Sequence, residues 1–202
     1  MTRVRDLLRS NGGASAAEFA LVLPLLLLLL FGVIDAGRFM WEYNRAEKAT
    51  QMGVRFAATT DPVLGSGFSD YSFPVNDGIT QGSPVPTANF SSATCTEGSC
   101  TCTGGDVCDE VGYDSDAFQR ITDRMTAMYP QISQNNVSIE YKNVGLGFAG
   151  DPNGPDVAPL ITVRLTDLVF HPITCLMFAC SIDMPDFRAS LTAEDLSGTI
   201  SN

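Results

Sequence analysis

The stretch FALVLPLLLLLLFGVI, residues 19–34, decides the fold of this chain of 202 residues. Of its 16 residues, 13 are Leu, Ile, Val or Phe. At about −0.3 to −0.6 kcal/mol each on an insertion scale, these residues contribute about −4 to −8 kcal/mol. With Ala16 and Ala17 before it and residues 36–40 after it, the run predicts a helix that can cross the ~30 Å apolar core of a bilayer. Six consecutive leucines make every face apolar, which excludes an amphipathic surface helix.

Charge predicts the orientation of this single membrane pass. Residues 1–13 carry three arginines and one aspartate, a net of +2, and the remainder carries nine basic and 22 acidic residues, a net of −13. Because positive charge stays on the cytoplasmic side, we expect a basic cytoplasmic leader at 1–13 and an extracytoplasmic body. Because phosphates would repel a body this acidic, a nucleic-acid partner is not expected. A secretory signal is the alternative, but the residues after the run, IDAGRFMWEYNR, contain no A-x-A-like cleavage site.

Six cysteines predict disulfides in an oxidising compartment. They form two groups, Cys95, Cys100, Cys102 and Cys108 in one segment and Cys175 and Cys180 in another. One intervening residue rarely permits a disulfide, so Cys100 does not pair with Cys102. Two local pairings stay open, 95–100 with 102–108 or 95–102 with 100–108. A zinc site is the rival interpretation, but the cysteines form no CxxC pair and His171 is far from the group of four.

The segment NGGASAAEFALVLPLLLLLLFGVIDAGRF resembles the N-terminus of TadE-like proteins, which are pseudopilins or minor pilins of the bacterial tight-adherence (Flp-type) pilus systems. Their leader is short, basic and ends in glycine, after which a prepilin peptidase cuts. A glutamate stands at the fifth mature position, followed by an aromatic residue and an apolar run.

Carried onto this sequence, the resemblance makes Gly13 the last leader residue, Ala14 the first mature residue, Glu18 the fifth and Phe19 the sixth. Tyrosine is commoner than phenylalanine at the sixth position of the major pilins. The resemblance implies that Glu18 pairs with the amine of Ala14 on a neighbouring subunit, which would offset the cost of a carboxylate near lipid. It also implies a prepilin peptidase and other pilus-system subunits as partners, and a location in the bacterial inner membrane. The residues alone are also compatible with a signal anchor that is never cut.

The rest of the chain predicts an α+β domain. The first helix should continue to about residue 58, with an apolar stripe of Phe39, Tyr43, Met52 and Phe56 packed on a sheet. Residues 61–112 show little periodicity and predict a long loop holding the four clustered cysteines.

A second helix should begin at an Asp114 or Ser115 cap and end at Pro130, with Phe118, Ile121, Met125 and Met128 on one face. Strands are predicted at 137–142, 160–170 and 186–194. The predicted fold is therefore α+β and pilin-like, with a long N-terminal transmembrane helix packed on a small antiparallel sheet, and with domains 1–13, 14–60 and 61–202.

No catalytic pattern is present in the sequence, so we predict neither an enzyme nor a cofactor. GxSxG, HExxH and phosphate-loop motifs are absent. His171 precedes a proline in an apolar stretch and fits a strand end. The acidic residues between 97 and 110 do not follow the EF-hand order, and we expect them to be solvated. The favoured prediction is a TadE-like pseudopilin or minor pilin in pilus assembly. The alternatives are an uncleaved membrane-anchored binding protein with a cysteine-rich interaction loop and, less favoured, a secreted hydrolase.

Overall fold

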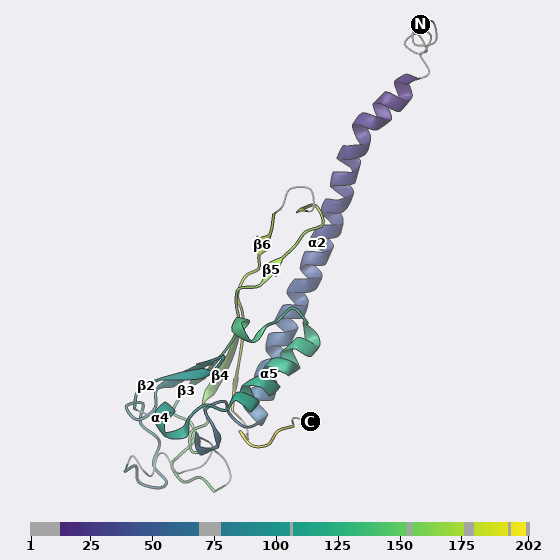
Figure 1. The fold of residues 1–202 in the computed structure, drawn as a ribbon. Helices are drawn as coiled ribbons and strands as arrows, with labels where there is room; N and C mark the ends of the chain where they lie inside the picture. Colours follow the sequence, from purple (N-terminus) through teal and green to yellow (C-terminus); the bar gives the residue numbers. More distant parts are fainter. Residues whose placement is uncertain are drawn as a thin grey trace, which may run out of the picture. The chain divides into compact units, whose positions relative to one another are not determined.

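The computed structural model describes residues 13–68, 78–105, 107–152, 155–175, 180–193 and 195–200. The chain forms two compact units. One contains the chain up to Trp41 together with Phe170–Ile182, and the other contains Glu42–Val169 and Asp183–Asn202. Helix α2 (Ala14–Thr59) contributes to both units (Figure 1). The predicted leader, except for Gly13, lies outside the described residues.

Helix α2 is one continuous helix of 46 residues, close to the predicted span of 16–58. It continues through Pro24, as membrane helices tolerate. It ends just before Thr60 and Asp61, where Pro62 disfavours helical geometry for the residue ahead of it.

The first unit pairs the early part of α2 with a short hairpin. Strands β5 (Val169–Phe170) and β6 (Ile182–Asp183) form a two-stranded sheet at the boundary of this unit. The ring of Phe170 meets the ring of Phe39 edge to face, with centroids 5.4 Å apart. We call the described residues of this segment, 169–175 and 180–183, the β5–β6 hairpin.

The second unit is built on a five-stranded sheet in the order β2-β1-β3-β4-β7. All four neighbouring pairs are antiparallel. The strands are β1 (Ser92–Thr96), β2 (Ser99–Thr103), β3 (Val137–Lys142), β4 (Leu160–Leu165) and β7 (Phe187–Thr192). Helices η2 (Ser66–Phe68), α4 (Val107–Val111), α5 (Ser115–Met128) and η3 (Gln134–Asn136) complete the unit. The architecture confirms the predicted α+β class with a long N-terminal helix and a small antiparallel sheet.

The core of this unit lies between the sheet and the helices α2 and α5. On β3 the alternation is as predicted, with Val137, Ile139 and Tyr141 all buried. Helix α2 approaches closely at Gly53, where an added Cβ would lie 2.7 Å from the sulfur of Met125 on α5 and 3.5 Å from Val163 on β4.

The predicted apolar stripe of α2 packs on the sheet at Tyr43, whose ring meets the ring of Phe187 on β7 edge to face with centroids 4.9 Å apart, but the stripe is not the most buried face of the helix. Phe39, Tyr43, Met52 and Phe56 are only half-buried. The fully buried face consists of small residues instead, Ala46, Ala49, Ala57 and Ala58 together with Val54. Small side chains let the helix lie close to its neighbours. The face that allows this close packing is therefore the buried one, and not the face with the larger side chains.

The predicted loop at 61–112 is in part regular structure. Residues 92–103 form the β1–β2 hairpin, whose two-residue turn contains Gly98 at a φ of +86°. The strand residues are mostly Ser, Thr and Cys, so the stretch lacks the apolar alternation typical of strands. The hairpin exists because β1 pairs with β3, from Ser92↔Lys142 to Cys95↔Ile139, which is a long-range interaction.

Two other predicted elements also differ. The strand expected at 160–170 breaks after Leu165, because Asp167 adopts a left-handed φ of 57°. The side-chain amide of Asn136 holds this break by donating to the carbonyls of Thr166 and Asp167 at 3.0 and 3.3 Å. Helix α5 begins at the predicted Asp114 cap, which accepts from the backbone of residues 116 and 117. Of the residues predicted to share one face of this helix, Phe118, Ile121 and Met125 are buried and Met128 is 39% exposed.

Candidate functional site: the apolar helix and the carboxylate at its end

The residues predicted to direct processing lie at the very start of α2. Gly13 is exposed and directly precedes Ala14, the first residue of the helix. A Cβ added at Gly13 would meet no atom of the described residues within 4 Å. Glu18 and Phe19 follow on the helix surface, both exposed. The fold therefore places no demand of its own on a glycine at position 13.

The apolar run after Phe19 is helical and uncovered. Leu21, Leu25 and Leu29 are 81%, 73% and 67% exposed, and the most apolar stretch of the helix is not buried by any described part of the chain. By length and composition, α2 is a candidate membrane span near the N-terminus. Uncovered leucines on this scale mark a surface that lipid or another protein must cover.

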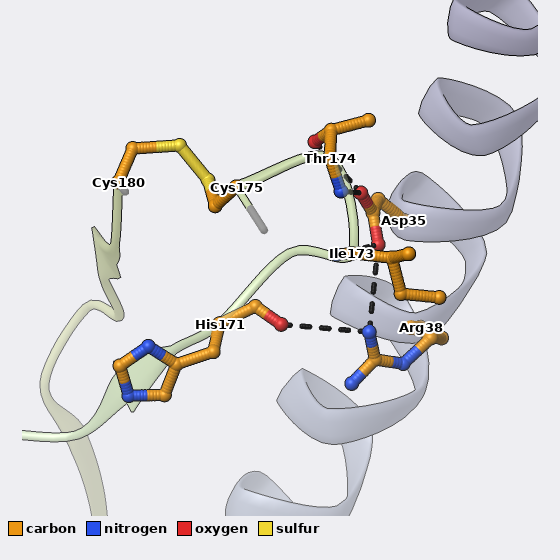
Figure 2. A network of polar contacts seen from close by, with 7 residues as sticks. All are labelled: Asp35, Arg38, His171, Ile173, Thr174, Cys175 and Cys180. Carbon is orange, nitrogen blue, oxygen red and sulfur yellow. Dashed lines mark hydrogen bonds and ion pairs between the residues drawn. A yellow bond between two sulfur atoms is a disulfide. The ribbon is translucent and has the colours of Figure 1, made fainter. Parts of the chain in front are cut away.

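A buried carboxylate marks the end of the apolar run. Asp35 follows Ile34 directly, yet it is only 6% exposed. One carboxylate oxygen accepts from the backbone N–H of Ile173 at 2.7 Å, and the other accepts from the backbone N–H and the hydroxyl of Thr174 at 2.9 and 2.8 Å. Figure 2 shows Asp35 pointing from α2 into the turn that carries these donors. Backbone donors to an ionised carboxylate are strong hydrogen bonds, so the contact fastens the β5–β6 hairpin to α2.

Arg38 joins this network from the next turn of α2. Its guanidinium lies 3.4 Å from Asp35 and donates to the carbonyl of His171 at 3.4 Å (Figure 2). Its Cζ also lies 5.4 Å from the ring centroid of Phe170. His171 follows β5 directly, as expected of a strand-end residue, and its side chain is exposed. The arginine thus balances the charge of Asp35 and makes a second connection to the hairpin.

A groove lies between α2 and the β5–β6 hairpin. Its volume is about 400 Å³. Apart from Asp35 and Thr174 its lining is non-polar, made of Gly32, Ala36, Phe39, Phe170, Pro172 and Ile182. Gly32 belongs to the apolar run itself, so the groove opens where the apolar run ends.

All six cysteines are paired in the structure. Of the two pairings left open for the group of four, the structure has Cys95–Cys100 and Cys102–Cys108. The first disulfide joins directly paired residues of β1 and β2, and the second links β2 to α4. The third is Cys175–Cys180, next to the Asp35 contact (Figure 2). Within the described part of the chain, no group of three or more His, Cys, Asp or Glu side chains could hold a metal ion.

The sequence prediction missed the role of Asp35. The signal available was an acidic residue placed directly after an uninterrupted apolar run, where a charge near lipid is costly unless paired. Its partners are 138 and 139 residues away in the chain, so no local pattern could identify them.

Comparison with known proteins gives one result for the N-terminal segment. The family model of TadE-like proteins matches residues 13–55. The match begins at Gly13 and covers the whole apolar run, Asp35 and most of the remaining helix. No curated protein and no solved structure matches the chain.

Proposed function

We propose that this chain, whose residues 13–55 match the TadE-like family, is a minor pilin or pseudopilin that acts in assembly of a tight-adherence pilus. At the level of the family, the match supports a pilin-type structural protein and association with other pilus components. The observation that carries the proposal is the uncovered apolar helix that starts at the Gly13–Phe19 motif.

The membrane position of the chain follows from charge and chemistry. We propose that α2 crosses the bacterial inner membrane once, with the arginine-rich leader in the cytoplasm. The acidic domain with its three disulfides then lies in the periplasm or outside the cell, where disulfides persist. This orientation uses the helix as an anchor before assembly and leaves the folded domain free to meet partners.

Processing would create the group that Glu18 needs. Cleavage after Gly13 by a prepilin peptidase would leave a positive amine on Ala14 at the start of α2. The Glu18 carboxylate of the neighbouring subunit would pair with that amine, and the pairing would neutralise its charge near lipid. The Glu18 carboxylate makes no hydrogen bond or ion pair with the described part of its own chain, which leaves it available for such pairing.

The N-terminal residue of the membrane-purified protein tests the processing claim. We expect Ala14 as the first residue in cells with a prepilin peptidase and Met1 in cells without it. Gly13→Leu should block the cut and leave a longer product, because the fold itself has room for a side chain there. Gly12→Leu, the neighbouring substitution in the leader, is the matched control and should still be cut. An intact N-terminus in the presence of the peptidase would refute processing.

A separate variant tests assembly. Glu18→Gln keeps the size of the side chain and removes its charge. We expect this variant to be cut after Gly13 but to be lost from complexes with other pilus subunits in pull-down experiments. Recovery equal to that of the unaltered chain would show that Glu18 does not act in assembly.

The alternative is an uncut, membrane-anchored binding protein. The observation in its favour is the β1–β2 hairpin, which two disulfides fix at the edge of the sheet. A chain that keeps Met1 and remains in the membrane would favour this function over the pilin. A start near Gly37 would instead indicate secretion.

A further inference from the structure

We propose that the β5–β6 hairpin lies in the headgroup layer of the bilayer and that the groove between it and α2 holds a phospholipid acyl chain. This inference rests on the membrane anchor of the proposed function and adds a second, non-spanning membrane contact to it. The hairpin comes from sequence far beyond the anchor, so it is a distinct lipid-binding element.

The position of the hairpin follows from the Asp35 contact. Asp35 is the first residue after the apolar run at 19–34, and its two carboxylate oxygens hold the backbone of Ile173 and Thr174 at 2.7 and 2.9 Å. Counted from Ala16, the 19 residues up to Ile34 cover about 28 Å of the ~30 Å apolar thickness, at about 1.5 Å per residue. The hairpin is therefore fastened to the helix at the depth where the apolar core ends.

The groove has the chemistry of a lipid contact. Gly32 and Ala36 on α2 have small side chains that leave space, and the rings of Phe39 and Phe170 form apolar walls. Ile182, on the second strand of the hairpin, lines the groove while remaining 45% exposed. Because Gly32 also belongs to the membrane span, the surrounding lipid is in direct contact with the open groove.

The polar groups beside the groove are already paired in a way that suits lipid. Asp35 accepts from Ile173, from Thr174 and from Arg38, so an acyl chain entering the groove would meet no unsatisfied carboxylate. A paired carboxylate of this kind costs far less near hydrocarbon than an isolated one.

The residues that follow have the order of a membrane–water interface. Arg38, with 41% of its side chain exposed, directly precedes Phe39 of the groove, and Trp41, two residues after Phe39, is 67% exposed. A guanidinium at this depth is complementary to lipid phosphate, and tryptophan is enriched at the level of the headgroups. The groove opens beside the apolar run, which lipid surrounds in the proposed function, and Trp41 follows at headgroup level, so the position of the groove favours lipid over the helix of a second copy.

Quenching by brominated lipid tests the proposal on the full chain in phosphatidylcholine vesicles. The unaltered chain has one tryptophan, Trp41, which serves as the internal reference. In a Trp41→Phe background, Ile182→Trp places the reporter in the groove. Lipid brominated on the acyl chain close to its carbonyl should quench this reporter about as strongly as it quenches Trp41 in the unaltered chain. Phe148→Trp in the same background, at a site 40% exposed in the other unit, is the control and should be quenched far less.

The outcomes separate the anchor from the hairpin. Quenched Trp41 with an unquenched Ile182→Trp reporter would overturn the hairpin proposal and leave the anchor standing. If neither is quenched, the chain does not enter the bilayer and both proposals fail. Quenching of Phe148→Trp equal to that of Ile182→Trp would also overturn the inference, because contact would then be unspecific. An unquenched reporter that crosslinks to a second chain would identify the occupant as another copy.

A further variant tests the connection to the helix. Asp35→Ala removes the acceptor for the hairpin donors. Added to the reporter chain, it should remove most of the quenching of the Ile182→Trp reporter. In a chain that carries only Asp35→Ala, Trp41 should still be quenched. Equal quenching with and without Asp35 would show that this residue does not set the depth of the hairpin.

Discussion

Replacing Arg45 by methionine should destabilise the second unit, because this arginine caps the end of α5. Its Nε and Nη2 donate to the backbone carbonyl of Met128, the last residue of the helix, at 2.9 and 2.6 Å. Its Cζ lies 5.8 Å from the ring centroid of Tyr129. The carbonyls of a final helical turn have no partner within the helix, so Arg45 on α2 satisfies one of them from outside.

The expected loss is about 2 kcal/mol. A hydrogen bond from a charged donor contributes about 1.5–3 kcal/mol, and partial exposure brings this to about 1–2 kcal/mol. The attraction of this charge to the C-terminal end of the helix is already part of the charged hydrogen bond, so only the ring contact is added, at about 0.5 kcal/mol. For a domain of this size, 1 kcal/mol lowers the melting temperature by about 2–4 °C, so we expect a decrease of about 4–8 °C.

Thermal unfolding followed by near-ultraviolet circular dichroism measures the effect on the full chain in detergent micelles. Lys48→Met is the matched control, since it removes the same charge from an exposed position on the same helix. We expect it to change stability by less than about 0.5 kcal/mol. Arg45→Lys should fall between the two, because an ammonium lacks the planar fork. If Arg45→Met melts within about 1 °C of Lys48→Met, the capping argument is wrong.

Four other predictions concern stability and chemistry. Asn143→Ala should cost about 2–4 kcal/mol in denaturant titration, because the buried amide donates to two carbonyls at 3.0 Å and accepts from a backbone N–H at 2.8 Å. Gly53→Leu should destabilise the fold in the same assay, with partial rescue by Met125→Ala, because its Cβ would lie 2.7 Å from the Met125 sulfur. Burial, reinforced by the Glu42 carboxylate, raises the pKa of Tyr129 to about 12. The contribution of Tyr129 to stability should therefore be complete below about pH 10 and disappear as the pH rises towards 12. Absorbance titration would follow the ionisation of this tyrosine. The six cysteines should react with an alkylating reagent only after reduction, which mass spectrometry can check.

Local patterns were sufficient for the elements whose stability is local. The 46-residue helix was predictable because both of its causes are local. Its apolar run is visible in the sequence, and no proline stands between Pro24 and Pro62 to end the helix. The cap at Asp114 was predictable because an N-cap depends only on the two or three residues after it. Strand β3 alternates because one face of the sheet is buried, and that alternation is visible in the sequence.

Long-range partners decided the rest of the domain. The β1–β2 hairpin consists of small polar residues and cysteines, and its place in the sheet depends on pairing with β3. The break after Leu165 depends on Asn136, which is 30 residues away from Thr166. The buried face of α2 was decided by how closely α5 and β4 approach Gly53, which a helical periodicity does not encode.

The sequence by itself determined that this chain has an apolar helix able to span a membrane, a basic segment before it, a motif like that of TadE proteins at Gly13–Phe19, and cysteines suited to disulfides. These properties depend on composition and on spacing within a few residues. Only the tertiary structure decided which groups pair with the carboxylate at the end of the apolar run. Asp35 finds its donors on Ile173 and Thr174, because chain folding brings that hairpin to the helix and a carboxylate beside an apolar run requires partners.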